Sequence, residues 1–238
     1  MNRFVLAVFA VGFPAAPGSG SLVLPDLRGL SANRAYPALL VAGFFLGAAL
    51  FTTTGYATLY LTESVRTGTA LAGVGFAAMQ LLGSAGRVVG GGLADRLTAR
   101  GIPQARGAAT TLLGMAVVGA ACLGVLATTT PPPLLALVVL GVVGATVLGF
   151  TGLYYTCVAG LIDEGKLGAA TAGGQTALNA GALLAPPAFG WLVDFRSYET
   201  GWLLLAACMA VAVVLLAGVR RWTGTDARDA VQSARETA

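Results

Sequence analysis

Polar side chains inside the long apolar stretches of this chain are the residues that could do chemistry. Thr171, Gln175 and Asn179 are spaced four residues apart, so on a helix they lie on one face. In a membrane, an unpaired polar group that faces lipid is costly, so we expect such side chains to line a cavity. The candidate cavity residues are Thr53, Tyr56, Gln80, Tyr154, Gln175 and Asn179.

Hydrogen bonding between helices is an alternative role for these residues, and it needs no ligand. The tyrosines near the end of a stretch, Tyr56 and Tyr60 among them, could also anchor a helix at the membrane surface. The sequence alone leaves cavity lining, helix bonding and surface anchoring open for this set.

Arg87 is the only formal charge well inside an apolar stretch. It lies four residues before Gly91 and eight before Asp95, so the three residues share one helix face. One interpretation is that Arg87 extends its side chain to the membrane surface. The other is that Arg87 and Asp95 form a charge lock that holds one conformation and breaks in another. No Asp or Glu lies within a stretch to relay a proton.

The composition argues against catalysis and metal binding. The chain has no histidine, which removes the usual imidazole base and the usual imidazole metal ligand. Its cysteines, Cys122, Cys157 and Cys208, are too scattered for a metal-binding spacing and are typical of small apolar packing residues. We therefore expect no enzyme, no cofactor and no metal site.

These side chains must be positioned by helices that cross a membrane. The 238 residues are 56% hydrophobic and 10% charged, against roughly 25% charged in a soluble domain. A span takes about 20 apolar residues, and the run Thr128 to Pro133 divides the longest uncharged stretch in two. The stretches are apolar on all sides, and they lack the alternation of membrane β-strands. We predict an all-α membrane protein, a bundle of six transmembrane helices at Pro37 to Leu61, Ala70 to Leu93, Gly107 to Ala127, Leu134 to Leu161, Leu167 to Val193 and Trp202 to Val219.

The basic residues indicate which side of the membrane each connection occupies. Eight of them fall on one set of alternate connections, at Arg28, Arg34, Arg96, Arg100, Arg106, Lys166, Arg220 and Arg221. The other set carries only Arg66 and Arg196. The positive-inside rule then places the first set, and both ends of the bundle, in the cytoplasm. The net charge of +4 therefore orients helices and does not form a face for nucleic acid.

The two ends of the chain are read separately from the transmembrane domain, residues 37–222. Residues 223–238 have almost no large apolar side chain, which predicts a disordered cytoplasmic tail. The apolar run Phe4 to Phe13 is too short to span, and residues 1–36 are interpreted as the remnant of a clipped helix followed by a cytoplasmic connection. A cleaved signal peptide and an interfacial or disordered leader are the alternatives, although a cleaved signal would leave Arg28 outside.

The end of the second span carries a motif. Gly86 to Arg96 reads Gly-Arg-Val-Val-Gly-Gly-Gly-Leu-Ala-Asp-Arg, which resembles the signature of the major facilitator superfamily of secondary transporters, roughly Gly-x-Leu-Ala-Asp-Arg-x-Gly-Arg-Arg. Gly91 or Gly92 through Arg96 match it, and Leu97 to Gly101 depart from it. The family carries this motif after the second helix of each six-helix half. The resemblance implies a conformational role for Asp95 and Arg96, and with them Arg87, Gly91 and Gly92.

A second likeness lies in the fifth span. Pro187, Gly190 and Asp194 resemble the Pro-x-x-Gly-x-x-x-Asp ending of the family's eleventh helix, where we expect the helix to break. The resemblance covers nearly all of Pro37 to Trp222. Family members have about twelve helices in two related halves, with the substrate site between them. The arrangement here is similar to the carboxy-terminal half, and the amino-terminal half is the alternative because both halves carry the motif.

The resemblance implies transport of a small solute by alternating access across the lipid bilayer. The composition, rich in Arg, Ala, Gly and Val with a single lysine, favours the bacterial inner (plasma) membrane. Because one wall of the site is missing, we expect the chain to need a second copy or a separate partner half. Sugars, amphipathic drugs and small organic anions held by Arg87 all fit such a site. The alternative function is a non-transporting membrane interaction protein that pairs with a full-length relative and regulates it. A membrane enzyme is a third possibility.

Overall fold

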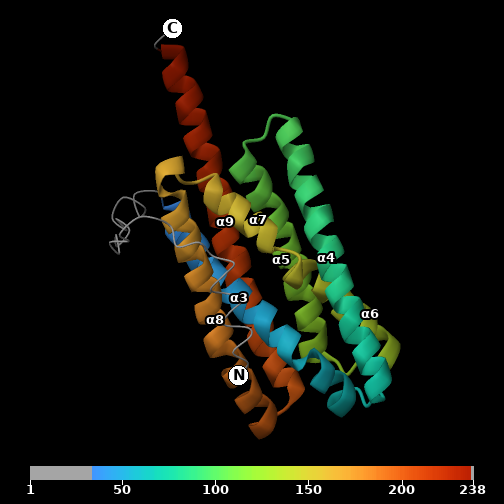
Figure 1. Ribbon diagram of the computed structural model, residues 1–238. Helices are drawn as coiled ribbons and strands as arrows, with labels where there is room; N and C mark the ends of the chain where they lie inside the picture. Colours follow the sequence, from blue (N-terminus) through green and yellow to red (C-terminus); the bar gives the residue numbers. More distant parts are fainter. Residues whose placement is uncertain (1–33, 237–238) are drawn as a thin grey trace, which may run out of the picture.

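A computed structural model describes residues 34–236, and within that range the only regular elements are helices joined by short connections (Figure 1). Six helical segments are long and apolar enough to cross a membrane, which confirms the prediction of an all-α protein with six spans. The segments are α3 (Ala35–Leu59) with its π-helical end η1 (Tyr60–Ser64), α4 (Thr69–Ala99), α5 (Gln104–Thr128), α6 (Pro133–Val143) with η2 (Gly144–Leu148) and α7 (Thr151–Ala159), α8 (Leu167–Phe195) and α9 (Tyr198–Glu236). One 3-10 turn, η3 (Glu164–Lys166), precedes α8. The predictions for residues 1–33, Arg28 included, lie outside the described residues.

Helix ends follow the turn residues that the sequence indicates. α5 ends at Thr128 and α6 begins at Pro133, so the Thr-Pro run does separate two spans. Pro132 is the residue before the α6 helix, and Pro133 takes the first helical position, where a missing N–H costs nothing. Several helices extend beyond the predicted spans, because a helix can continue into the polar headgroup region after the hydrocarbon ends.

The fourth span differs from its prediction. The sequence predicts one continuous helix from Leu134 to Leu161, but the structure has α6, the π-helical η2 and then a turn at Gly149 and Phe150 before α7. Glycine is a poor helix former, and Gly141, Gly144 and Gly149 all fall in this segment. The span is therefore one helical segment whose regular hydrogen-bond ladder is interrupted at η2 and the following turn, which we call the break, although Gly149 and Phe150 keep right-handed helical dihedrals.

α8 does not break at its prolines. The helix runs unbroken from Leu167 to Phe195 with Pro186 and Pro187 in its interior, contrary to the expected helix break at Pro187. A proline removes one backbone donor and so frees the carbonyl four residues earlier. Helices in membranes tolerate this where neighbouring groups satisfy the freed backbone.

The carboxy-terminal tail also differs from its prediction. α9 continues as one helix to Glu236 and projects beyond the rest of the bundle (Figure 1), where the sequence predicts a disordered segment from residue 223. Part of the difference comes from composition, because alanine is the commonest residue of the tail and, with its two arginines, favours helix even when no apolar face is present.

Helix packing leaves two helices at the edge of the bundle. α3 packs closely on α8 and on α9, α5 packs closely on α9, and α4 packs mainly on η2 and α5. In the most apolar window of each span, the buried share of residues is 56% for α3 but 28% for α4 and 22% for α8. Both helices therefore expose a large part of their surface, and the polar rows described next lie on them.

Candidate functional site

The polar row of α8 forms a short hydrogen-bonded chain at the surface of the bundle. The Gln175 Nε2 group donates to Asn179 Oδ1 at 2.8 Å, one helical turn away. The Tyr155 hydroxyl of α7 donates to Gln175 Oε1, which links the two helices. Gln175 and Asn179 are exposed and Thr171 is half-buried. The spacing of four thus places both amides together on an open face.

A second polar row runs along α4. Gln80, Arg87, Gly91 and Asp95 fall within one side of this helix, and Gln80 is exposed near its middle. Towards the end of α4 the row opens on a pocket of about 190 Å³ between α4, α7 and the start of α5. Its lining residues are Arg87, Gly91, Ala94, Asp95, Thr98, Gln104, Gly152, Leu153 and Thr156.

Arg87 binds the broken fourth span. Its Nε group donates to the carbonyl oxygen of Leu148 at 3.3 Å. Leu148 is the last residue of η2, where the change from π-helix to turn interrupts the regular backbone ladder. Arg87 therefore satisfies a carbonyl at the helix discontinuity. This contact was not predicted, because nothing in the residue pattern of the fourth span signals the break.

The two polar rows belong to one face because both border α7. Tyr155 of α7 bonds to the α8 row, while Gly152 and Thr156 of α7 line the pocket of the α4 row. We call this surface the polar face: Gln80, Arg87, Gly91 and Asp95 of α4, Gly152, Tyr155 and Thr156 of α7, and Thr171, Gln175 and Asn179 of α8. It runs from one edge helix to the other across the broken span.

Three of the predicted cavity residues lie away from this face. Tyr154 is 0% exposed, and its hydroxyl donates to the Gly174 carbonyl at 3.4 Å between α7 and α8. Tyr56 donates from α3 to the Pro186 carbonyl of α8 at 3.2 Å. Thr53 is buried in α3, and its hydroxyl has no hydrogen-bond partner in the described part of the chain. A further interhelical bond, from Tyr36 to the Ala170 carbonyl at 3.0 Å, escaped the sequence reasoning.

The residues of the family-like motif are brought together only in part. Arg87, Gly91 and Asp95 line the same pocket, whereas Gly92 and Arg96 are exposed on other sides of α4. No ion pair joins Arg87 to Asp95 in this conformation of residues 34–223. Gly86, earlier in the motif, lies directly against the backbone of Ala145, so the glycine-rich stretch permits the close crossing of α4 and η2.

The end of α8 that carries Gly190 and Asp194 belongs to an aromatic cluster. The Tyr56 hydroxyl lies against Gly190, where a side chain would not fit. The ring centroids of Tyr60 and Phe189 lie 5.2 Å and 5.1 Å from that of Trp202. Tyr198 donates to Glu63 Oε2 at 2.6 Å, and Asp194 is exposed nearby. This cluster holds the ends of α3, α8 and α9 together. Among the side chains that the structure describes, up to residue 223, no three His, Cys, Asp or Glu gather as metal ligands would.

Comparison of the chain with models of known protein families and with curated proteins finds no match in either.

Proposed function

We propose that this chain is one half of a secondary transporter of the major facilitator type. It forms one wall of a pathway along which a small solute moves by alternating access. The supporting observation is the polar face. Its amides and charges are exposed on α4 and α8, the two spans with the smallest buried share, and its hydroxyls are half-buried beside them on α7 and α8. Contact of these groups with acyl chains would be costly, so water or a second half-transporter should cover them.

The chemistry of the face suits binding without covalent steps. After the bonds between Tyr155, Gln175 and Asn179 are counted, both amides retain further donor and acceptor capacity. These groups match the hydroxyls of a sugar or the polar part of an amphipathic molecule. Arg87 adds a cation for a small organic anion. The proposal includes no enzymatic activity and no cofactor.

The discontinuous fourth span supports the conformational part of the proposal. Transporters commonly build their sites around broken helices whose backbone groups are satisfied by neighbours or by cargo. Here Arg87 of α4 donates to Leu148 at the break. A movement of η2 and α7 relative to α4 would break this bond and change the pocket that contains Asp95. The bond is therefore a candidate for a contact that holds one conformation and breaks in the other.

The partner and the location follow from the same features. We propose a second copy or a separately encoded half as the opposite wall, in the inner (plasma) membrane, with both ends of the bundle in the cytoplasm. The excess of basic residues on one set of connections supports this orientation.

Aqueous labelling of the polar face tests the proposal without knowledge of the solute. In a protein whose Cys122, Cys157 and Cys208 are replaced by alanine, single cysteines Asn179→Cys and Leu184→Cys are compared in native membranes. Leu184 is 60% exposed and lies on a different side of the same helix, five positions after Asn179, so it should face lipid. A water-soluble maleimide needs a thiolate, so labelling of N179C should exceed that of L184C by about tenfold or more. Equal, slow labelling of both sites would mean that the face is dry.

A non-transporting interaction protein is the second candidate, because Gln175 and Asn179 already bond to each other and could pack dry against a partner. Uptake of sugars, organic anions and amphipathic dyes into vesicles separates the two. Q175L/N179L should lower transport about tenfold or more, whereas a docking role predicts no uptake by either protein. T176V is the control, since Thr176 bonds only to its own helix at Ala172. Uptake by vesicles that hold isolated monomers would contradict the need for a partner.

A further inference from the structure

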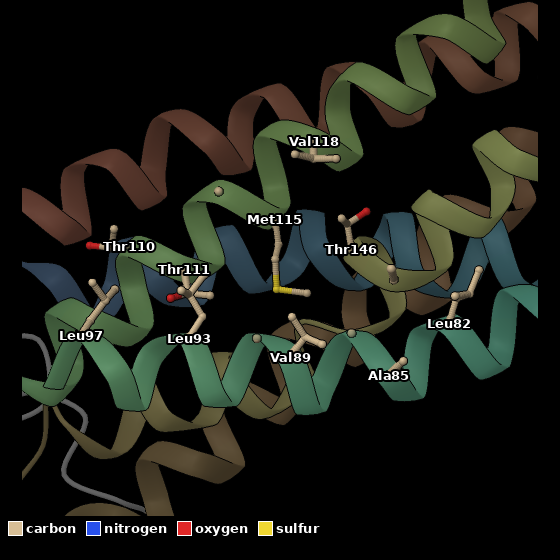
Figure 2. Close-up of a pocket in the computed structure, with 14 residues that line it drawn as sticks. Leu82, Ala85, Val89, Leu93, Leu97, Thr110, Thr111, Met115, Val118 and Thr146 are labelled. Carbon is tan, nitrogen blue, oxygen red and sulfur yellow. The ribbon is translucent and has the colours of Figure 1, made fainter. Parts of the chain in front are cut away.

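An apolar groove lies between α4, α5 and η2, on the opposite flank of α4 from the polar row. It has a volume of about 720 Å³, within the range of sites that hold whole small molecules, about 300 to 1,000 Å³. Figure 2 shows Met115 reaching from α5 towards Val89 and Leu93 of α4, with Thr146 of η2 at one side. Its lining is almost wholly apolar: Leu82, Ala85, Gly86, Val89, Gly90, Leu93, Leu97, Thr110, Thr111, Gly114, Met115, Val118, Ala145 and Thr146.

The groove should face lipid rather than the solute pathway. On α4 its residues and the polar row lie on either side of the strip that packs on the bundle, which includes Met79, Gly83 and Gly90. Neighbouring positions on the groove side are strongly exposed and apolar, with Val89 at 69%. The three threonines in its wall, Thr110, Thr111 and Thr146, donate to carbonyls four residues earlier in their own segments. The groove therefore offers apolar contact along its length.

Basic residues gather where the groove ends. Arg96 follows the groove residue Leu93 by three positions, and Arg100 follows Leu97 by three, so both continue the groove side of α4. Arg106 precedes Thr110 by four positions on α5 and is half-buried. Among residues 34–223, no carboxylate forms an ion pair with any of these arginines. The start of α5 adds the partial positive charge of a helix amino terminus.

We propose that the groove and its arginines form a binding site for one anionic phospholipid of the surrounding membrane. An acyl chain lies along the groove past Met115, and the phosphate group lies at Arg100 and Arg106. The match is one of charge and of shape, because an apolar channel that ends in unpaired cations complements a molecule with an apolar tail and an anionic head. Basic sites between transmembrane helices bind anionic headgroups in this way. The proposal depends on membrane insertion and not on the proposed transport.

Occupation of the groove would bear on the broken fourth span. Gly86 and Ala145 line the groove and also form the close crossing of α4 with η2. The next residue along, Arg87, holds the Leu148 carbonyl from the other flank. An acyl chain in the groove therefore fills space beside the crossing, so binding should favour the conformation described here and raise the temperature at which the protein unfolds.

Photolabelling tests the site in the intact chain. The protein is reconstituted in phosphatidylcholine vesicles that contain a trace of phosphatidylglycerol carrying a diazirine on its acyl chain. Two variants challenge the site. Gly114→Leu fills the groove, where a Cβ at Gly114 meets open space and so causes no clash, and R100Q/R106Q removes the cations. Their controls are Gly124→Leu, equally open on the same helix, and R34Q/K166Q, at the same end of the bundle but on α3 and α8.

The expected result is labelling of peptides from the facing sides of α4 and α5. G114L should reduce it about tenfold by filling the groove, and R100Q/R106Q should reduce it about 25-fold, since each of the two basic residues contributes about a fivefold preference for anionic lipid. G124L and R34Q/K166Q should leave it unchanged, and all four variants should unfold at about the same temperature as the unaltered protein in phosphatidylcholine alone, which shows that they fold alike. Equal labelling by a diazirine phosphatidylcholine, with no effect of R100Q/R106Q, would overturn the proposal and leave only ordinary lipid contact. Loss of the preference in the presence of inorganic phosphate would overturn it in favour of a soluble anion.

Discussion

α3 and α8 pack against each other along much of their length, yet they hold their polar side chains in opposite ways. In α3 and η1, Thr52, Thr53 and Tyr60 are buried, and their hydroxyls have no partner among the described residues. In α8, Gln175 and Asn179 are exposed and bonded to each other. A polar residue in an apolar helix therefore indicates function only once its position in the bundle is known. The interior of this bundle carries polar groups that do not reach the polar face.

The largest effect on the free energy of unfolding should come from a substitution where α3 and α8 meet. Gly181 of α8 lies directly against the Phe44 carbonyl of α3, with no room for a side chain. Gly181→Leu should lower the free energy of unfolding in detergent by about 3 kcal/mol or more, because the helices must separate. The control on the same helix is Gly168→Leu, where a side chain would meet open space. If thermal unfolding shows equal stability for both variants, the close packing of α3 on α8 is wrong.

A smaller effect on the free energy of unfolding is expected at two buried tyrosines. Its sign should differ between them, because one hydroxyl has a hydrogen-bond partner and the other has none. The Tyr154 hydroxyl donates to Gly174, so Y154F should lower the free energy of unfolding by about 0.5 to 1 kcal/mol. The Tyr60 hydroxyl is buried without a partner, so Y60F should leave stability unchanged or raise it by about 1 kcal/mol. Denaturant unfolding of the two variants makes the comparison. A loss of stability in Y60F would show that water or another group meets the hydroxyl.

The smallest effect is expected at the polar face. Q175L/N179L replaces two exposed amides, so the free energy of unfolding should change by no more than about 0.5 kcal/mol. The same unfolding measurement on this variant completes the comparison between interior and edge. A loss as large as that of Gly181→Leu would mean that these amides hold the bundle together, and their role in a pathway would lose its support.

Much of the fold could be predicted from the sequence because lipid imposes a simple rule on length and polarity. The stretches between charges gave all six spans, and the Thr-Pro run separated α5 from α6. The break at η2 could not be predicted, because the fourth span is apolar throughout and its glycines also suit close helix packing. The helical tail was missed because low hydrophobicity was taken as disorder, although Ala, Arg and Glu still favour helix.

The candidate site was predictable only as far as one helix determines it. A spacing of four is enough to place Gln175 beside Asn179 and Arg87 in line with Asp95. Whether a tyrosine joins the polar face depends on how neighbouring helices cross: Tyr155 reaches Gln175, while adjacent Tyr154 is buried between α7 and α8. Such contacts between distant segments carry no signal in a single sequence.

The bond between Arg87 and Leu148 constrains how the protein can be made. The two residues are separated by 61 positions, so at roughly 5 to 20 residues per second the ribosome needs roughly 3 to 12 seconds to reach the acceptor after the donor has been synthesised. During that interval the guanidinium has no Leu148 carbonyl to bind, and it must stay near water or borrow another acceptor. The second helix is therefore complete well before its hydrogen-bond partner in the fourth exists, and this contact between them forms only after the fourth helix has been synthesised.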